Sequence, residues 1–145
     1  MQVYRSGILS KGSISIPKEG DYDWYKRRYK DNLEKFSALN EKGGVKEINI
    51  ENKRYRGKLA ILSKELVPTG GEAPAFFECK DYMSKFQCTV SYNKHDKNLL
   101  VSYTHRYDTG YVEDPDYLGI YHDAERWVSS MMEAAEDYKE KVGAY

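Results

Sequence analysis

A short basic run, Lys53-Arg54-Tyr55-Arg56-Gly57-Lys58, has the residue types and spacing for recognition of a charged partner. Side chains on one face of a β-strand repeat every second residue, so Arg54, Arg56 and Lys58 fall on a common face. Their spacing of roughly 6–7 Å is comparable to the phosphate spacing of a nucleic-acid strand. Lys26, Arg27 and Lys30 can extend this surface, with Trp24 as a stacking platform. The run predicts contact with a single-stranded nucleic acid or an acidic partner. The alternative is a solvated strand face.

An acidic segment balances this run. Six Asp or Glu residues and no Lys or Arg lie between Asp108 and Glu125, whereas seven Lys or Arg and three Glu lie between Lys42 and Leu66. Opposed patches of this kind steer the association of proteins. The spacing of an EF-hand calcium loop is absent, and Pro115 interrupts the segment. Candidate contacts for a basic partner are Asp108, Glu113, Asp114 and Asp116.

Other patterns give no support for catalysis. Asp108-Thr109-Gly110 matches the tripeptide of aspartic proteases, but that chemistry needs two such aspartates sharing one proton, and a turn explains the tripeptide equally well. His95, His105 and His122 lack metal-ligand spacing. Cys88 can lie near His105, but on a predicted core face, where a cysteine is an inert hydrophobe. We therefore expect no enzymatic activity, no metal and no cofactor.

Composition indicates one globular domain spanning residues 1–145. The chain is 40% hydrophobic and 32% charged, with a formal net charge of zero. Its apolar runs are far too short for a membrane span, and Met1-Gln2-Val3-Tyr4-Arg5 lacks the apolar core of a signal peptide. We expect a cytoplasmic protein without membrane contact. Fourteen tyrosines suit half-buried strands and recognition surfaces.

The clearest predicted element is a β-hairpin from Phe86 to Tyr107 that turns at His95-Asp96. In this register Val90 faces Val101 and Cys88 faces Tyr103, which places the apolar side chains on one face. A strand over Ala75 to Asp81 precedes the hairpin. With a turn at Met83-Ser84, Cys79 lies opposite Cys88, close enough for a disulfide that a cytosolic chain would usually keep reduced.

Helical periodicity appears twice, from Asp21 to Lys42 and from Ile120 to Val142, with Asp123 as the expected N-cap of the second helix. Strands are predicted within residues 2–16, at Val45 to Ile50 and at Arg54 to Leu66, followed by a loop to Pro74. The expected fold is an α+β two-layer sandwich: an antiparallel meander of five to seven strands with both helices on one face. This order of elements is similar to that of helix-grip folds, an analogy of topology alone.

These features favour a non-catalytic binding protein that occupies a macromolecular surface, for instance a phage or mobile-element accessory or inhibitor protein. A protein partner is expected rather than a nucleic acid. The alternatives are single-stranded nucleic-acid binding through the basic strand, and a small-ligand pocket lined by Tyr, Met and Trp side chains. An unpaired edge strand can also pair two copies of the chain.

Overall fold

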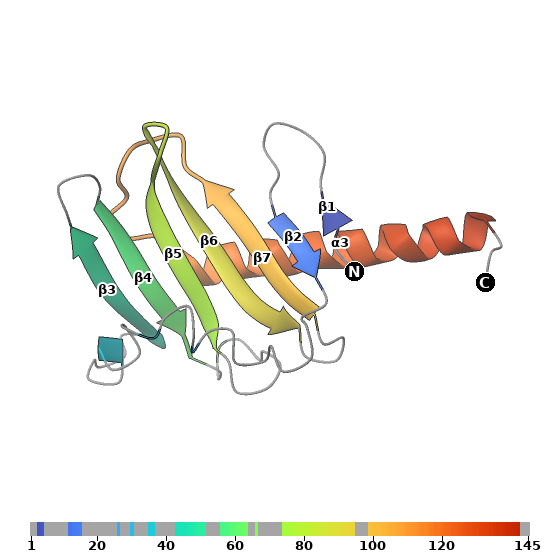
Figure 1. The fold of residues 1–145 in the computed structure, drawn as a ribbon, viewed down its shortest axis with the longest axis horizontal. Helices are drawn as coiled ribbons and strands as arrows, with labels where there is room; N and C mark the ends of the chain where they lie inside the picture. The colour runs from blue at the N-terminus through green and yellow to red at the C-terminus, as the bar shows by residue number, and fades with distance from the viewer. Residues whose placement is uncertain are drawn as a thin grey trace.

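A computed structural model describes residues 3–4, 12–15, 26, 30, 35–36, 43–51, 56–63, 66, 74–94 and 99–142. These residues form a single antiparallel sheet in the order β1-β2-β7-β6-β5-β4-β3, with a long helix across one face (Figure 1). The α+β class is confirmed. The elements are β1 (Val3–Tyr4), β2 (Gly12–Ser15), β3 (Val45–Glu51), β4 (Arg56–Leu62), β5 (Ala75–Tyr82), β6 (Lys85–Lys94), β7 (Leu99–Arg106) and α3 (Tyr117–Val142).

The hairpin formed by β6 and β7 is present, but its predicted register is wrong by two residues. Val90 pairs with Tyr103, and Cys88 pairs with His105. A shift of two residues keeps every side chain on its predicted face, so the apolar pattern is satisfied by both registers. The strands end with Lys94 opposite Leu99. The connection therefore spans four residues instead of the assumed two-residue turn, and those residues lie outside the described part of the chain.

The hairpin formed by β5 and β6 has the predicted register, with Cys79 opposite Cys88. Met83 and Ser84 form the two-residue turn and have φ angles of 51° and 68°. Positive φ at both positions is what a type I′ hairpin turn requires, although Asn and Gly are the residues that favour it. Cys79 and Cys88 form a buried disulfide with a Cα–Cα distance of 4.0 Å. The bond departs from the reduced state expected of a cytosolic chain.

Loss of this disulfide is expected to destabilise the fold measurably. The bond closes a short loop with a sequence separation of 9, and loop-closure entropy predicts a cost of roughly 2–3 kcal/mol for Cys79→Ala/Cys88→Ala. Urea unfolding of the variant, of oxidised wild type and of reduced wild type measures the effect. Equal midpoints for oxidised wild type and the double variant would show that the bond does not contribute to stability.

Aromatic side chains hold α3 against the sheet. Ring pairs join Phe77 to Tyr117 and Tyr92 to Tyr121, with ring centroids 4.9 and 5.0 Å apart in edge-to-face geometry. Such pairs stabilise by about 0.5–1.5 kcal/mol beyond the burial of their area. The second half of the helix extends past the sheet (Figure 1), and residues 133–137 are all exposed. The described side chains of α3 that pack on the core lie between Tyr117 and Met132.

Glu125 of α3 adds a polar attachment to β6. Its carboxylate accepts hydrogen bonds from the hydroxyl of Tyr92 at 2.6 Å and the ammonium of Lys94 at 2.7 Å. Burial and this carboxylate raise the pKa of Tyr92 far above the ordinary phenol value. The hydroxyl of Tyr121 also donates to Glu125, at 3.4 Å, and burial with this carboxylate raises the pKa of Tyr121.

The predicted helix over Asp21 to Lys42 is not confirmed, because most of it lies outside the described residues. Its described members, Lys26, Lys30, Lys35 and Phe36, have helical backbone. Phe36 packs on Leu59 and Phe76, which face away from α3. The prediction that both segments cover the same face is therefore wrong at Phe36. The central strands are apolar on both faces, so each face can bury a neighbour.

The helix α3 begins one turn earlier than predicted. Asp116 is its N-cap: the Asp116 Oδ1 atom accepts a hydrogen bond from the Gly119 amide at 3.1 Å, and its carbonyl accepts one from Ile120 at 2.9 Å. Asp123 lies inside the helix, so its predicted role as N-cap is wrong. Within the described part of the chain, no helix combines the length and apolarity that a membrane span requires.

Candidate functional site

The end of the sheet that carries the β5–β6 turn gathers exposed residues from two segments. The segment after β7 passes beside this turn before it reaches α3 (Figure 1). Its backbone extends the sheet pairing, because the Phe86 amide donates to the Thr109 carbonyl at 2.9 Å and the Tyr107 amide donates to the Phe86 carbonyl at 2.9 Å. We give the name hairpin-end surface to six exposed residues of these two segments: Met83, Ser84, Lys85, Asp108, Glu113 and Asp114.

Met83 is the most exposed large hydrophobic residue of the described chain, with 82% of its surface accessible. It occupies a left-handed backbone conformation that costs an L-residue with a Cβ atom about 1–2 kcal/mol. Strained residues of this kind cluster at functional sites. The disulfide between Cys79 and Cys88 cross-links the two strands that carry the turn, so Met83 is presented from a rigid support.

Tyr111 anchors the acidic loop, residues 107–116 between β7 and α3, to the sheet. Its ring meets Phe86 edge-on at 5.3 Å, and the guanidinium carbon of Arg56 lies 3.9 Å from its centroid. A cation held over an aromatic face contributes about 0.5–1 kcal/mol at an exposed site. Arg56 also lies 4.0 Å from the carboxylate of Glu51, an exposed pair of small energetic weight. These contacts give the loop a defined position beside the turn.

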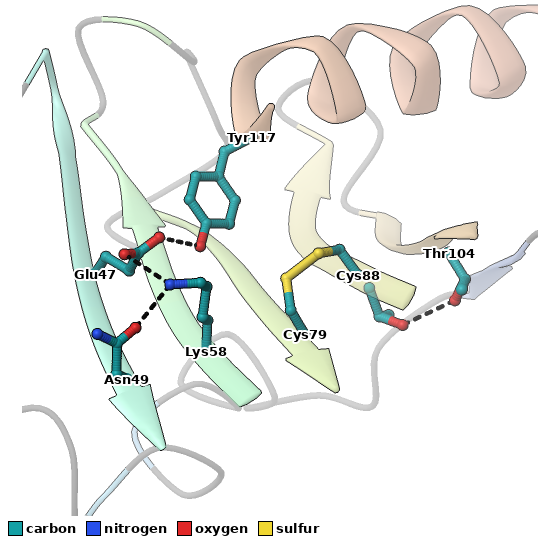
Figure 2. The surroundings of a disulfide bond; sticks show 8 residues. Glu47, Asn49, Lys58, Cys79, Cys88, Thr104 and Tyr117 are labelled. Carbon is teal, nitrogen blue, oxygen red and sulfur yellow. Dashed lines mark hydrogen bonds and ion pairs between the residues drawn. A yellow bond between two sulfur atoms is a disulfide. The ribbon is translucent and has the colours of Figure 1, made fainter. Parts of the chain in front are cut away.

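A polar network surrounds the buried Lys58 side chain (Figure 2). The Lys58 ammonium donates to Asn49 Oδ1 at 2.7 Å and to Glu47 Oε1 at 3.2 Å, and the Tyr117 hydroxyl donates to Glu47 Oε2 at 2.5 Å. Burial alone lowers the pKa of Lys58, but the Tyr111 hydroxyl and the Glu47 carboxylate outweigh it and raise that pKa. Burial and the hydrogen bond to Glu47 raise the pKa of Tyr117. The network joins β3, β4 and the first turn of α3.

This network corrects the prediction for the basic strand. Lys58 is only 1% exposed and ion-paired, so it is not available to a nucleic acid or an acidic protein. The side chains of β4 do alternate between the two faces of the sheet. The face shared by Arg56 and Lys58, however, is the one that α3 and the acidic loop cover. Arg56 is exposed, as are Lys26 and Lys30. The remaining candidates, Trp24, Arg27, Lys53 and Arg54, lie outside the described residues.

The acidic candidates divide into two groups. Asp108, Glu113 and Asp114 are exposed, and nothing in the described chain neutralises them by an ion pair within 4 Å. Asp116 is also exposed, but its carboxylate caps α3 and is committed to the helix. Three of the four predicted carboxylates are therefore exposed in the loop after β7, whose Thr109 carbonyl pairs with Phe86 beside the β5–β6 turn. Sequence reasoning missed the exposed Met83 in that turn.

The catalytic alternatives find no assembled site in the described residues. Cys88 and His105 are neighbours across β6 and β7, but Cys88 is bonded to Cys79 and has no free thiol. No group of three or more His, Cys, Asp or Glu side chains in the described segments is arranged to hold a metal ion. Asp108-Thr109-Gly110 forms part of the surface loop that pairs with Phe86.

The chain was compared with models of known protein families, with curated proteins and with solved structures, and none of them matches it. The interpretation of the surface therefore depends on its own geometry.

Proposed function

We propose that this chain is a non-catalytic binding protein that occupies the surface of a protein partner through the hairpin-end surface. The observation that carries the proposal is Met83, exposed on a strained, disulfide-supported turn beside the acidic loop that follows β7. Methionine adapts to irregular apolar pockets and is frequent in protein interfaces. The partner it fits has an apolar pocket with a basic rim.

Charge favours this partner over a nucleic acid. The loop after β7 contributes three exposed carboxylates, Asp108, Glu113 and Asp114, which repel phosphate groups. The alternative of nucleic-acid binding through the basic strand is weakened, because Lys58 is buried in the polar network. Electrostatic attraction to a basic rim raises the association rate, so affinity is expected to fall as salt rises.

Site-directed photocrosslinking tests the proposal. p-Benzoylphenylalanine is placed at Lys85 beside the turn, and in a control protein at Glu136 on the exposed half of α3. Extract of the source cells supplies the partner. Support is a protein captured from position 85 alone, lost with Met83→Ser and weakened by salt. Identical capture from both positions, or capture that Met83→Ser leaves unchanged, contradicts the site. Labelled single-stranded DNA, RNA and duplex form a parallel arm, and tight binding there would identify a nucleic-acid partner instead.

A double substitution in the turn is expected to raise stability and to abolish binding. Met83→Asn/Ser84→Gly matches the preferred type I′ sequence and is expected to raise the free energy of unfolding by about 1 kcal/mol. The same variant removes the apolar side chain and is expected to abolish capture of the partner. Urea unfolding and crosslinking from position 85 measure the two effects. A variant that is more stable and still binds normally would show that Met83 is dispensable.

A further inference from the structure

The sulfur atoms of this chain differ in how easily an oxidant can reach them. Its two cysteines are bonded to each other, so neither presents a thiol. Four methionines supply the remaining sulfur, of which Met1 lies outside the described residues. A thioether is oxidised to a sulfoxide, and reductases can reverse this change. The order in which the methionines react therefore depends on their exposure.

Met83 is far more accessible than the two methionines of α3. It is 82% exposed, and the left-handed backbone of the β5–β6 turn holds it at the end of the sheet (Figure 1). Met131 and Met132 are half-buried and pack on the hydrophobic core. An oxidant that diffuses in solution therefore meets the Met83 thioether before it meets those of α3.

We propose that Met83 is a site of reversible oxidation by hydroperoxides, and that its sulfoxide form inactivates the hairpin-end surface. The second part rests on the proposed function. Hydrogen peroxide transfers one oxygen atom to the thioether: an S–O bond forms, the O–O bond breaks, and the proton of the transferred oxygen moves to the leaving oxygen to give water. The sulfur loses two electrons and the peroxide gains them, so no other reactant is needed.

Oxidation changes what Met83 presents to a partner. The sulfoxide is polar, and its oxygen accepts hydrogen bonds. An apolar pocket that fits the thioether leaves this oxygen without a donor, which is expected to weaken binding about tenfold to a hundredfold. The fold is expected to tolerate the change, because the Met83 side chain is exposed to solvent. The same exposure makes the sulfoxide accessible to a reductase.

Peptide mapping by mass spectrometry, after timed exposure of the full chain to hydrogen peroxide, tests the chemical part. Met83 is expected to form sulfoxide about tenfold faster than Met131 and Met132, which are controls within the same molecule. The midpoint of urea unfolding is expected to stay unchanged while Met83 alone is oxidised. Equal rates at the three positions would overturn the proposal.

Photocrosslinking from position 85 tests the effect on binding, with oxidised protein freed of peroxide and dialysed extract of the source cells. Capture is expected to be lost on oxidation and restored by methionine sulfoxide reductases for both sulfoxide epimers. Met83→Leu keeps an apolar side chain without sulfur, so its capture is expected to persist after peroxide treatment. Oxidised protein that binds normally, while Met83→Ser does not, would overturn the inference and leave the proposed function standing. Capture that neither Met83→Ser nor peroxide changes would contradict both.

Discussion

Raising the pH above about 10 is expected to unfold this protein cooperatively. Burial raises the pKa of Tyr92, Tyr117 and Tyr121 above the ordinary phenol value of 10.0, helped by hydrogen bonds to Glu47 and Glu125. Above pH 10 the unfolded chain therefore releases protons that the folded chain retains, and stability falls with pH. Each retained proton lowers the free energy of unfolding by up to about 1.4 kcal/mol per pH unit, so three lower it by on the order of 4 kcal/mol per pH unit.

Lys58 also makes the stability of the fold decrease as the pH rises. Its pKa is raised above 10.5 in the fold, so its stabilising contribution is complete below that value and is lost as the pH rises through the higher folded value. Urea unfolding by circular dichroism at pH 8, 9, 10 and 11 measures the slope, and tyrosinate absorbance follows the release of protons.

Tyrosine variants provide the control for the alkaline transition. Tyr92→Phe and Tyr117→Phe each remove one retained proton, so each is expected to reduce the slope by up to about 1.4 kcal/mol per pH unit. Tyrosines that all ionise near pH 10 while the circular dichroism spectrum stays folded would contradict the prediction.

Glu47→Gln is expected to destabilise the protein by about 3–5 kcal/mol. The substitution removes the counter-charge of Lys58, whose side chain is only 1% exposed, and leaves its ammonium buried. Lys58→Met is expected to cost far less, about 1–2 kcal/mol, because it removes the buried charge itself. The remaining Glu47 side chain is 31% exposed and keeps its hydrogen bond from Tyr117. Chemical denaturation measures both changes.

The double variant Glu47→Gln/Lys58→Met isolates the interaction between the two residues. It is expected to be more stable than Glu47→Gln alone, because no buried ammonium remains without a partner. Equal costs for the two single variants, with additive behaviour in the double variant, would show that Lys58 is solvated in the folded protein.

Periodicity in the sequence was sufficient to predict the strands and their faces, but not which faces are covered. The charge of Lys58 suggested that its face of β4 is exposed to solvent. Both faces of β4 are in fact buried, as Leu59 and Ala60 show. A signal was present in β3, where Glu47 and Asn49 share a face and lie beside the same part of β4. Pairing the polar residues of adjacent strands would have indicated a buried network.

The start of α3 shows a similar limit. An apolar stripe that begins at Ile120 predicts Asp123 as the N-cap. Tyr117 extends the stripe by one turn and is buried against Phe77, so the cap is Asp116. The importance of Met83 was not predictable, because its exposure follows from the backbone conformation of the turn.

The part of α3 that extends past the sheet converts a small tilt of the helix into a larger movement of its far end. Met132 is the last described residue of the helix that packs on the core, and the helical backbone continues to Val142. This distance is about 15 Å at 1.5 Å per residue, so a tilt of about 10° at the sheet displaces the far end by about 3 Å. A small rearrangement of the docked half of α3 would therefore become a movement large enough for a fluorophore pair to detect.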